Sequence, residues 1–169
     1  AIGPNGSVVA FSTLNGFFHR LTGVNLALYA ITDWLGILPI LLAMGFAVLG
    51  LLQWIKRKSL WKVDFSILAL GVFYLITFGV FVFFEVFPIN YRPVLIEGIL
   101  ETSYPSSTTM LSLCILPTAM MQFQDRIQNK ILRNILLLSL AILTAFMVIA
   151  RLLSGVHWLT DIIGGILIS

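Results

Sequence analysis

Three residues near the end of the printed sequence have the types and the spacing to do chemistry together. Arg151, His157 and Asp161 stand in the pattern R-x5-H-x3-D within the stretch "ARLLSGVHWLTDIIGG". His157 and Asp161 are four positions apart, so on a helix they would share a face. A carboxylate bound to one ring nitrogen fixes the tautomer of a histidine and leaves the other nitrogen nucleophilic. The pattern therefore indicates a histidine nucleophile beside an arginine that can bind phosphate oxygens, or a polar boundary between two membrane helices.

A second group of residues has the features of an anion site. The stretch "NYRPVLIEGILETSYPSSTT" contains Arg92, and near its end Pro105 is followed by Ser106, Ser107 and Thr108. A proline in the first turn of a helix predicts free backbone amides at the helix N-terminus, and such amides bind anions. Two arginines, a helix N-terminus and a His–Asp pair indicate phosphoryl transfer through a phosphohistidine. No cluster of carboxylates suggests a metal, so we expect neither a metal nor another cofactor.

The composition places these residues in a membrane protein. Hydrophobic residues make up 59% of the 169 positions and charged residues 10%, whereas a soluble domain carries about 25% charged residues. The net charge of +3 is therefore attributed to membrane topology, and no nucleic-acid partner is expected. We expect an all-α, polytopic bundle of transmembrane helices whose partners are the lipid bilayer and a phosphorylated lipid.

Charge-poor intervals mark the expected membrane spans, because a helix needs about 20 mainly apolar residues to cross the bilayer. Within a single domain covering 1–169, these spans and a final partial one cover residues 34–55, 65–87, 107–124, 131–151 and 158–169. The last interval, at about 1.5 Å per residue, is too short to cross, so we expect the natural helix to continue. Residues 1–33 are expected to form an external segment, in which the spacing of Leu14, Phe17 and Leu21 predicts an amphipathic surface helix.

The basic residues are distributed unevenly between the expected loops. Seven of the ten lie in "IKRKSLWK" and "QDRIQNKILR", two loops that the order of the spans places on the same side of the membrane. By the positive-inside rule this side is cytoplasmic. Arg92, Arg151 and His157 then lie at the other face. We expect an integral plasma-membrane protein whose motif loops are on the non-cytoplasmic side.

The order and placement of these residues resemble those of the type-2 phosphatidic acid phosphatase (lipid phosphate phosphatase) superfamily, which also includes the vanadium haloperoxidases. The family's motifs are K-x6-R-P, P-S-G-H and S-R-x5-H-x3-D, and they match in order from about residue 85 to 165. The resemblance implies phosphate binding by Arg92, Arg151 and Ser106. It makes His157 the nucleophile and Asp161 the residue that orients it. It also implies a six-helix core whose first helix would precede the first residue of this chain.

Four positions depart from the motifs of that family. Glu85 occupies the place of the lysine, Ser107 that of the glycine and Ala150 that of the serine. Thr108 occupies the place of the histidine that the family uses as general acid toward the leaving group. A general acid contributes about 10²–10⁴-fold to the rate, and a threonine hydroxyl cannot replace it at neutral pH. An ionised Glu85 would oppose phosphate binding, unless it pairs with an arginine or faces away.

The leading hypothesis is an integral membrane phosphatase that hydrolyses a lipid phosphate or lipid diphosphate at the external face through a phosphohistidine. The backbone amides of Ser106, Ser107 and Thr108 would help the two arginines to bind phosphate. A diphosphate would suit the missing acid, since phosphate is a good leaving group. The main alternative is a weakly active or inactive family member that binds or moves a phosphorylated lipid. A vanadate-dependent peroxidase and a structural membrane protein are further alternatives.

Overall fold

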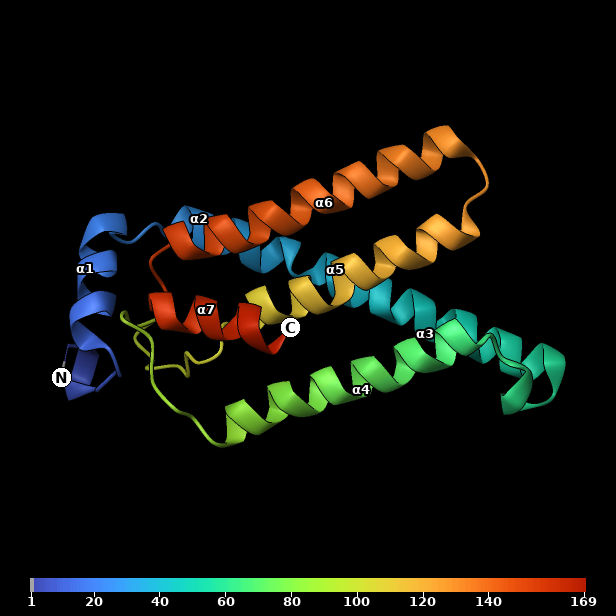
Figure 1. The fold of residues 1–169 in the computed structure, drawn as a ribbon. Helices are drawn as coiled ribbons and strands as arrows, with labels where there is room; N and C mark the ends of the chain where they lie inside the picture. Colours follow the sequence, from blue (N-terminus) through green and yellow to red (C-terminus); the bar gives the residue numbers. More distant parts are fainter. Residues whose placement is uncertain (1) are drawn as a thin grey trace.

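The computed structural model describes residues 2–169, which form a bundle of helices (Figure 1). The α-helices are α1 (Ser12–Thr22), α2 (Leu26–Leu35), α3 (Ile37–Arg57), α4 (Phe65–Val86), α5 (Ser107–Arg126), α6 (Lys130–Leu153) and α7 (Leu159–Ile168), and short 3-10 turns lie at Pro4–Gly6 and Leu60–Lys62. Within this part of the chain no strand forms. Two isolated β-bridges, Tyr91–Thr102 and Ile96–Ile99, lie in the long loop between α4 and α5. The predicted all-α bundle is confirmed.

Three stretches are long and apolar enough to cross a membrane: Leu26–Arg57, Phe65–Val86 and Lys130–Leu153. The first comprises α2 and α3, which meet at Gly36 with nearly helical backbone angles (φ −61°, ψ −15°). The sequence analysis begins this span at residue 34 because Asp33 is charged. In the structure Asp33 lies within α2, and Nη2 of Arg151 lies 3.7 Å from its carboxylate. Residues 26–33 therefore continue the apolar helical stretch of the first predicted span toward the N-terminus.

Helix α5 lies inside the bundle. It contacts α3, α4, α6 and α7, and eight of its residues are buried, against three in α4. The expected span over 107–124 is a helix. Its sequence is not apolar enough for it to count, like the three stretches above, as a candidate membrane span. Polar side chains such as Ser112 and Gln122 are buried on it. A helix enclosed by other helices can carry such groups, because protein and not lipid surrounds them.

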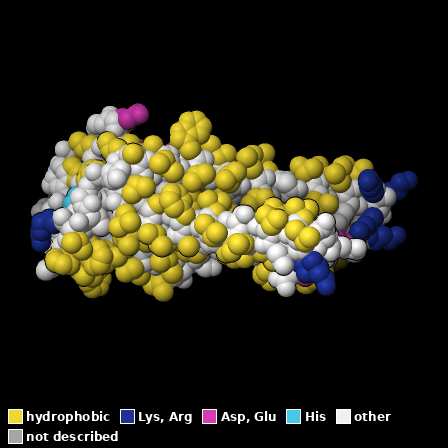
Figure 2. Space-filling model, turned by 90° about the horizontal axis from the view of Figure 1, so that it is seen from above, with side chains coloured by type: hydrophobic (Ala, Val, Ile, Leu, Met, Phe, Trp, Pro, Cys, Tyr) yellow, Lys and Arg dark blue, Asp and Glu magenta, His cyan; other side chains and the backbone are white. Residues whose placement is uncertain are grey.

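Basic side chains gather at one end of the bundle, and hydrophobic side chains cover its middle (Figure 2). At this end Asp64, which precedes α4, lies 2.8 Å from Nη1 of Arg57 and 3.1 Å from Nη1 of Arg126. Hydrogen bonds from Arg57, Gln53 and Arg126 lower the pKa of the Asp64 carboxyl to about 2. The α3–α4 and α5–α6 connections therefore meet at the same end, as the order of the predicted spans requires.

The opposite end carries α1, the loop between α4 and α5, and the turn between α6 and α7 (Figure 1). Helix α1 has exposed apolar side chains, Phe17 and Leu21 among them, and it covers the residues of the predicted amphipathic helix. Its Asn15 is fully buried and holds it against α7. Nδ2 of Asn15 donates to Oγ1 of Thr160 (3.0 Å), and the backbone amide of Thr160 donates to Oδ1 of Asn15 (3.1 Å).

Two glycines let α7 pack closely against the start of α5. A Cβ atom at Gly164 would lie 2.3–2.8 Å from the ring and hydroxyl of Tyr104, and one at Gly165 would lie 3.1 Å from the carbonyl oxygen of Ser106. A larger residue at either position would push α7 away from the start of α5.

The turn between α6 and α7 fits against the turn between α1 and α2. The amide of Asn25 donates to the carbonyl of Ser154 (2.9 Å). Gly155 has a φ of +66°, and a Cβ atom there would lie 1.8 Å from the carbonyl oxygen of Gly23. Only glycine fits this position, because any other residue would be strained and would collide with backbone.

Replacing Gly155 by alanine should therefore lower the free energy of unfolding by more than about 2 kcal/mol, through backbone strain and overpacking. The matched control is Gly79→Ala, because a Cβ atom there meets open space and alanine favours a helix by about 1 kcal/mol over glycine. Thermal unfolding in detergent would compare the two variants. A Gly155→Ala midpoint at or above that of the control would contradict this description of the turn.

Candidate active site

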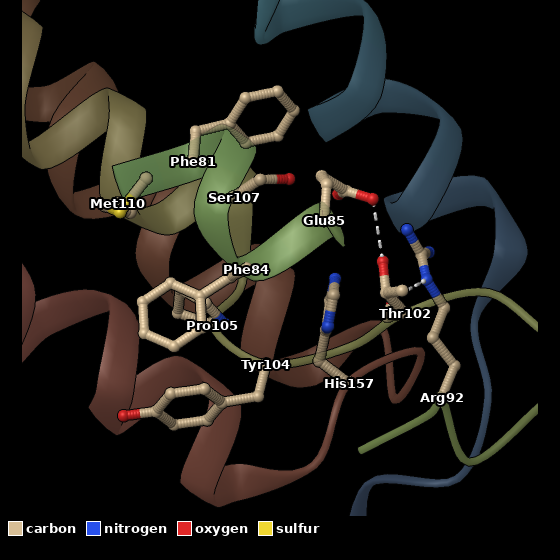
Figure 3. A pocket seen from close by; sticks show the side chains of 10 residues that line it. All are labelled: Phe81, Phe84, Glu85, Arg92, Thr102, Tyr104, Pro105, Ser107, Met110 and His157. Atoms are coloured by element: carbon tan, nitrogen blue, oxygen red, sulfur yellow. Dashed lines mark hydrogen bonds between the residues drawn. The ribbon is translucent and has the colours of Figure 1, made fainter. Parts of the chain in front are cut away.

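A cavity of about 20 Å³ lies at the end of the bundle opposite the basic loops (Figure 3). Residues from α4, the α4–α5 loop, the start of α5 and the turn before α7 contribute to it. The residues that line it are Phe81, Phe84, Glu85, Arg92, Thr102, Tyr104, Pro105, Ser107, Met110 and His157. The cavity thus brings together residues at the positions of all three motifs in the sequence analysis.

His157 lies in the turn after α6 and is 4% exposed. Its Nδ1 lies 3.1 Å from the carbonyl oxygen of Ser103 and 3.0 Å from the hydroxyl of the same residue. A carbonyl oxygen only accepts hydrogen bonds, so Nδ1 carries the ring proton and Nε2 has the lone pair. Within residues 2–169, Nε2 is buried without a hydrogen-bond partner, and in Figure 3 it points toward the space beside Glu85 and Ser107. This nitrogen is therefore free to act as a nucleophile.

Asp161 is next to His157 but does not bind it directly. Helix α7 begins two residues after His157, so the predicted shared helix face is wrong. The carboxylate oxygen Oδ2 lies 3.9 Å from Nδ1 of His157, which is beyond hydrogen-bond distance. Instead, Oγ of Ser103 donates to Oδ2 (2.5 Å), Nδ2 of Asn90 donates to Oδ1 (2.9 Å) and the amide of Trp158 donates to Oδ2 (2.9 Å). Asp161 is held by three donors and reaches the ring through Ser103.

Ser103 and Asn90 are parts of the site that sequence reasoning missed. They lie just outside the β-bridge between Tyr91 and Thr102, which closes the α4–α5 loop. The amide of Ser103 donates to the carbonyl of Asn90 (3.1 Å), so the two buried side chains reach Asp161 together. One signal in the sequence could have found them. Asn90 lies two residues before Arg92 and Ser103 two residues before Pro105, and small polar side chains next to motif residues are candidates for positioning those residues.

Arg92 lines the cavity and is 8% exposed. Its Nη2 pairs with Glu101 (3.0 Å), and its Nε lies 3.4 Å from the carbonyl oxygen of Thr102. Nη1 is buried and has no partner among the described residues. A buried guanidinium nitrogen without a partner, beside an open cavity, is suited to bind an anion.

Arg151 is fully buried beside the cavity and does not line it. Its Nη1 donates to Oγ1 of Thr32 (3.0 Å), and Nη2 lies 3.7 Å from the carboxylate of Asp33. The ring of Tyr29 contacts both arginines, with its centroid 4.7 Å from the guanidinium carbon of Arg151 and 5.5 Å from that of Arg92. Such cation–π contacts favour a fixed guanidinium position. Helix α2 therefore positions both arginines.

The start of α5 differs in part from the predicted anion site. Ser107 lines the cavity, whereas Ser106 and Thr108 do not. The amide of Ser106 donates to the backbone carbonyl of Asp161 (3.0 Å), and its hydroxyl lies 3.0 Å from Oγ1 of Thr109. The prediction that the Ser106 amide is free is wrong, because α7 lies against it. Ser106 is the N-cap residue of α5, so the free amides of its first turn begin at Ser107.

The comparisons with known proteins give the family of the chain. The model of the PAP2 superfamily matches residues 81–169, slightly more than half of the chain, and this range includes every residue that lines the cavity. The chain belongs to the PAP2 superfamily. No curated protein and no solved structure matches it. The family and the three apolar helices make it an integral membrane member of a phosphatase family, and they confirm the resemblance noted in its motifs.

The two main departures from the PAP2 motifs have different surroundings. Glu85 lines the cavity, and its Oε2 accepts a hydrogen bond from Oγ1 of Thr102 (3.0 Å). Within residues 2–169 it makes no salt bridge. It thus neither pairs with an arginine nor faces away from the site, the two arrangements that the sequence analysis considered. Thr108 is near the α2–α3 junction, where a Cβ atom built on Gly36 would lie 3.8 Å from its methyl group.

Burial and nearby positive charges lower the pKa of His157. Burial of the ring lowers the pKa of His157 well below its usual value, and the charges of Arg92 and Arg151 lower it further. The carbonyl of Ser103 opposes this shift and does not reverse it. His157 is therefore neutral at physiological pH, which is the form that a nucleophile needs.

We expect the imidazole of His157 to remain neutral as the pH falls through 6.5. NMR of histidine-labelled protein in detergent would follow the ring carbons, and a His19→Asn variant leaves one signal because the chain has only two histidines. Since the unfolded chain would bind the proton that the folded protein excludes, stability should fall as the pH drops below about 6.5. A titration midpoint at or above 6.5 would contradict the burial described here.

Proposed function

We propose that this PAP2 protein is a membrane phosphatase that hydrolyses a lipid phosphate or lipid diphosphate through a phosphohistidine intermediate. The observation that carries this proposal is the orientation of His157. Its Nδ1 is bound to the carbonyl of Ser103 (3.1 Å), and its unpartnered Nε2 points into the cavity that Arg92 also lines. A neutral imidazole with a fixed tautomer, beside an unpaired guanidinium, suits nucleophilic attack on phosphorus.

In the first proposed step, Nε2 of His157 attacks phosphorus, and the bond from phosphorus to the leaving oxygen breaks. Nη1 of Arg92 and the amide of Ser107 are placed to bind the phosphoryl oxygens in the transition state. The ring becomes positively charged as it bonds to phosphorus. The carbonyl of Ser103, and Asp161 acting through the hydroxyl of Ser103, stabilise this charge without taking the Nδ1 proton.

In the second step, water attacks the phosphohistidine, the phosphorus–nitrogen bond breaks and the lone pair returns to Nε2. Arg151 contributes at a distance in both steps. It adds positive charge beside the cavity, and it contacts the same Tyr29 ring as Arg92. Its role in the proposal is to hold and reinforce Arg92.

Two features favour a lipid as the substrate. The cavity has an apolar wall from α4 and α5, with Phe81, Phe84 and Met110, and a polar wall from the loops. It lies at one end of helices that carry exposed apolar side chains along their length. A molecule with a phosphate head and an apolar tail matches both walls. The basic loops lie at the other end, and by the positive-inside rule this supports a site on the non-cytoplasmic side.

A second candidate function is binding or moving a phosphorylated lipid without hydrolysis. Thr108 favours it, because this residue takes the place of a general acid and does not line the cavity. Under this alternative Arg92 and the start of α5 would retain the lipid phosphate, while His157 would serve only as part of the binding site.

Replacing His157 by alanine should abolish phosphate release from lipid mono- and diphosphates in detergent. It should also remove the acid-labile, base-stable phosphoprotein trapped by rapid quenching, because this adduct forms on the ring. The matched control is His19→Asn, which changes the other histidine and should retain turnover. Unchanged release by His157→Ala would refute the mechanism. Tight binding of lipid phosphates by the unmodified protein without any turnover would support the alternative function.

Replacing Ser103 by alanine should reduce kcat about ten- to hundredfold, the equivalent of one lost hydrogen bond to a charged group. KM should change little, because the Ser103 hydroxyl contacts Asp161 and His157 and does not line the cavity in which the substrate would bind. Asp161→Asn should reduce kcat by at least the same factor. In the double variant the two losses should not add, since the residues act as one unit. Additive losses would show that Asp161 orients the ring without Ser103.

A further inference from the structure

The proposed hydrolysis leaves one requirement unmet, a proton for the leaving oxygen. When the leaving group is an alcohol, the oxygen departs with a full negative charge unless an acid protonates it, and such an acid contributes about 10²–10⁴-fold to the rate. Thr108 cannot supply this proton, because its hydroxyl is too weak an acid and its side chain does not line the cavity. The proton donor must therefore be found among the residues that do.

Four side chains that line the cavity carry titratable groups, Glu85, Arg92, Tyr104 and His157, while the hydroxyls of Thr102 and Ser107 are acids as weak as that of Thr108. His157 is the nucleophile, and a guanidinium does not give up its proton in proteins. The hydroxyl of Tyr104 points away from the cavity in Figure 3 and lies against α7, where a Cβ atom on Gly164 would be 2.8 Å from it. Glu85 is the remaining group.

Glu85 is held in a suitable position. It is the penultimate residue of α4, and Thr102 connects it to the phosphate-binding side of the site. The hydroxyl of Thr102 donates to Oε2 of Glu85 (3.0 Å), while the carbonyl of Thr102 lies 3.4 Å from Nε of Arg92. In Figure 3 the carboxyl group of Glu85 and Nε2 of His157 border the same space. An oxygen of a phosphate bound there would lie between the nucleophile and this carboxyl group.

Glu85 forms no ion pair with the arginines of the site. Arg92 pairs with Glu101 (3.0 Å), and within residues 2–169 Glu85 makes no salt bridge. Its carboxyl group is therefore not held by a cation and is free to interact with the leaving oxygen of a bound substrate.

We infer that Glu85 is the general acid that protonates the leaving oxygen, in place of the histidine that Thr108 replaces. This inference rests on the proposed phosphatase function. In the first step Nε2 of His157 bonds to phosphorus, the phosphorus–oxygen bond breaks and the Glu85 proton moves to the leaving oxygen, which departs as a neutral alcohol. In the second step the Glu85 carboxylate takes a proton from the attacking water, the phosphorus–nitrogen bond breaks and inorganic phosphate leaves. Both residues return to their starting forms.

One residue then explains two departures from the PAP2 motifs. The motif histidine is dispensable because another acid lines the cavity, and the motif lysine is absent because its position carries that acid. Lipid monophosphates with alcohol leaving groups become substrates, so the protein does not require a diphosphate.

The test compares substrates whose leaving groups differ in their need for a proton. Dioctanoyl phosphatidic acid releases an alcohol and needs an acid, whereas 4-nitrophenyl phosphate releases a stable phenolate and needs none. Glu85→Gln should lower kcat/KM for the phosphatidic acid by about 10²–10⁴-fold and for 4-nitrophenyl phosphate by less than about tenfold. Thr102→Val, which removes the hydroxyl that holds the carboxyl group, should show a smaller loss with the same substrate preference. The control is Glu97→Gln, which removes a negative charge from the exposed part of the α4–α5 loop and should leave both rates unchanged.

Three outcomes would overturn the inference. Equal losses with both substrates would assign Glu85 to binding, and a gain with both would show that its charge only opposes phosphate. In either case turnover by the unmodified protein, lost in His157→Ala, would leave the proposed function standing. If the unmodified protein released no phosphate from either substrate and formed no phosphoprotein, the function and the inference would fail together.

Discussion

Asp161 joins the α4–α5 loop, the start of α5 and α7 at the site. It is completely buried, and an unpaired buried charge costs several kcal/mol. Three donors offset this cost: Ser103 and Asn90 from the α4–α5 loop and the amide of Trp158 from the start of α7. The backbone carbonyl of the same residue accepts from the amide of Ser106 at the start of α5. Loop, α5 and α7 must therefore assemble together around this residue, and their assembly places His157 at the cavity.

Arg92 and Arg151 are held differently from Asp161, because the two positive charges lie near each other. Arg92 and Arg151 both contact the ring of Tyr29, and each pairs with a separate carboxylate, Glu101 at 3.0 Å and Asp33 at 3.7 Å. Their repulsion is compensated in part, and buried nitrogens of both remain without partners among the described residues. A site that holds donors in place before the ligand arrives needs little rearrangement to stabilise a transition state. The excess of positive charge also keeps His157 neutral.

The motif residues could be located from the sequence, but their connections could not. The R-x5-H-x3-D pattern correctly indicated that His157 and Asp161 are neighbours, because four positions keep residues close in a helix or a tight turn. It gave the wrong route between them, since α7 begins after His157 and Ser103 enters from a loop far away in the sequence. Loop conformation depends on contacts such as the Tyr91–Thr102 bridge, and hydrophobic periodicity carries no information about these. The start of the first predicted span was likewise set by the charge of Asp33 alone, because the sequence does not reveal that Asp33 has Arg151 as its partner.

The position of α5 shows how a membrane protein can keep polar chemistry next to lipid. The three apolar stretches expose most of their side chains, whereas α5 is enclosed by four other helices and begins at the cavity. Its buried Ser106, Thr109 and Ser112 would be costly on a helix that faces lipid. Their enclosure keeps these groups away from lipid, while Ser107 in the first turn of α5 lines the cavity and α4 supplies an apolar wall. The same division places Glu85 in the last turn of α4, where an apolar helix meets the polar loop and an ionisable side chain can reach the cavity without crossing lipid.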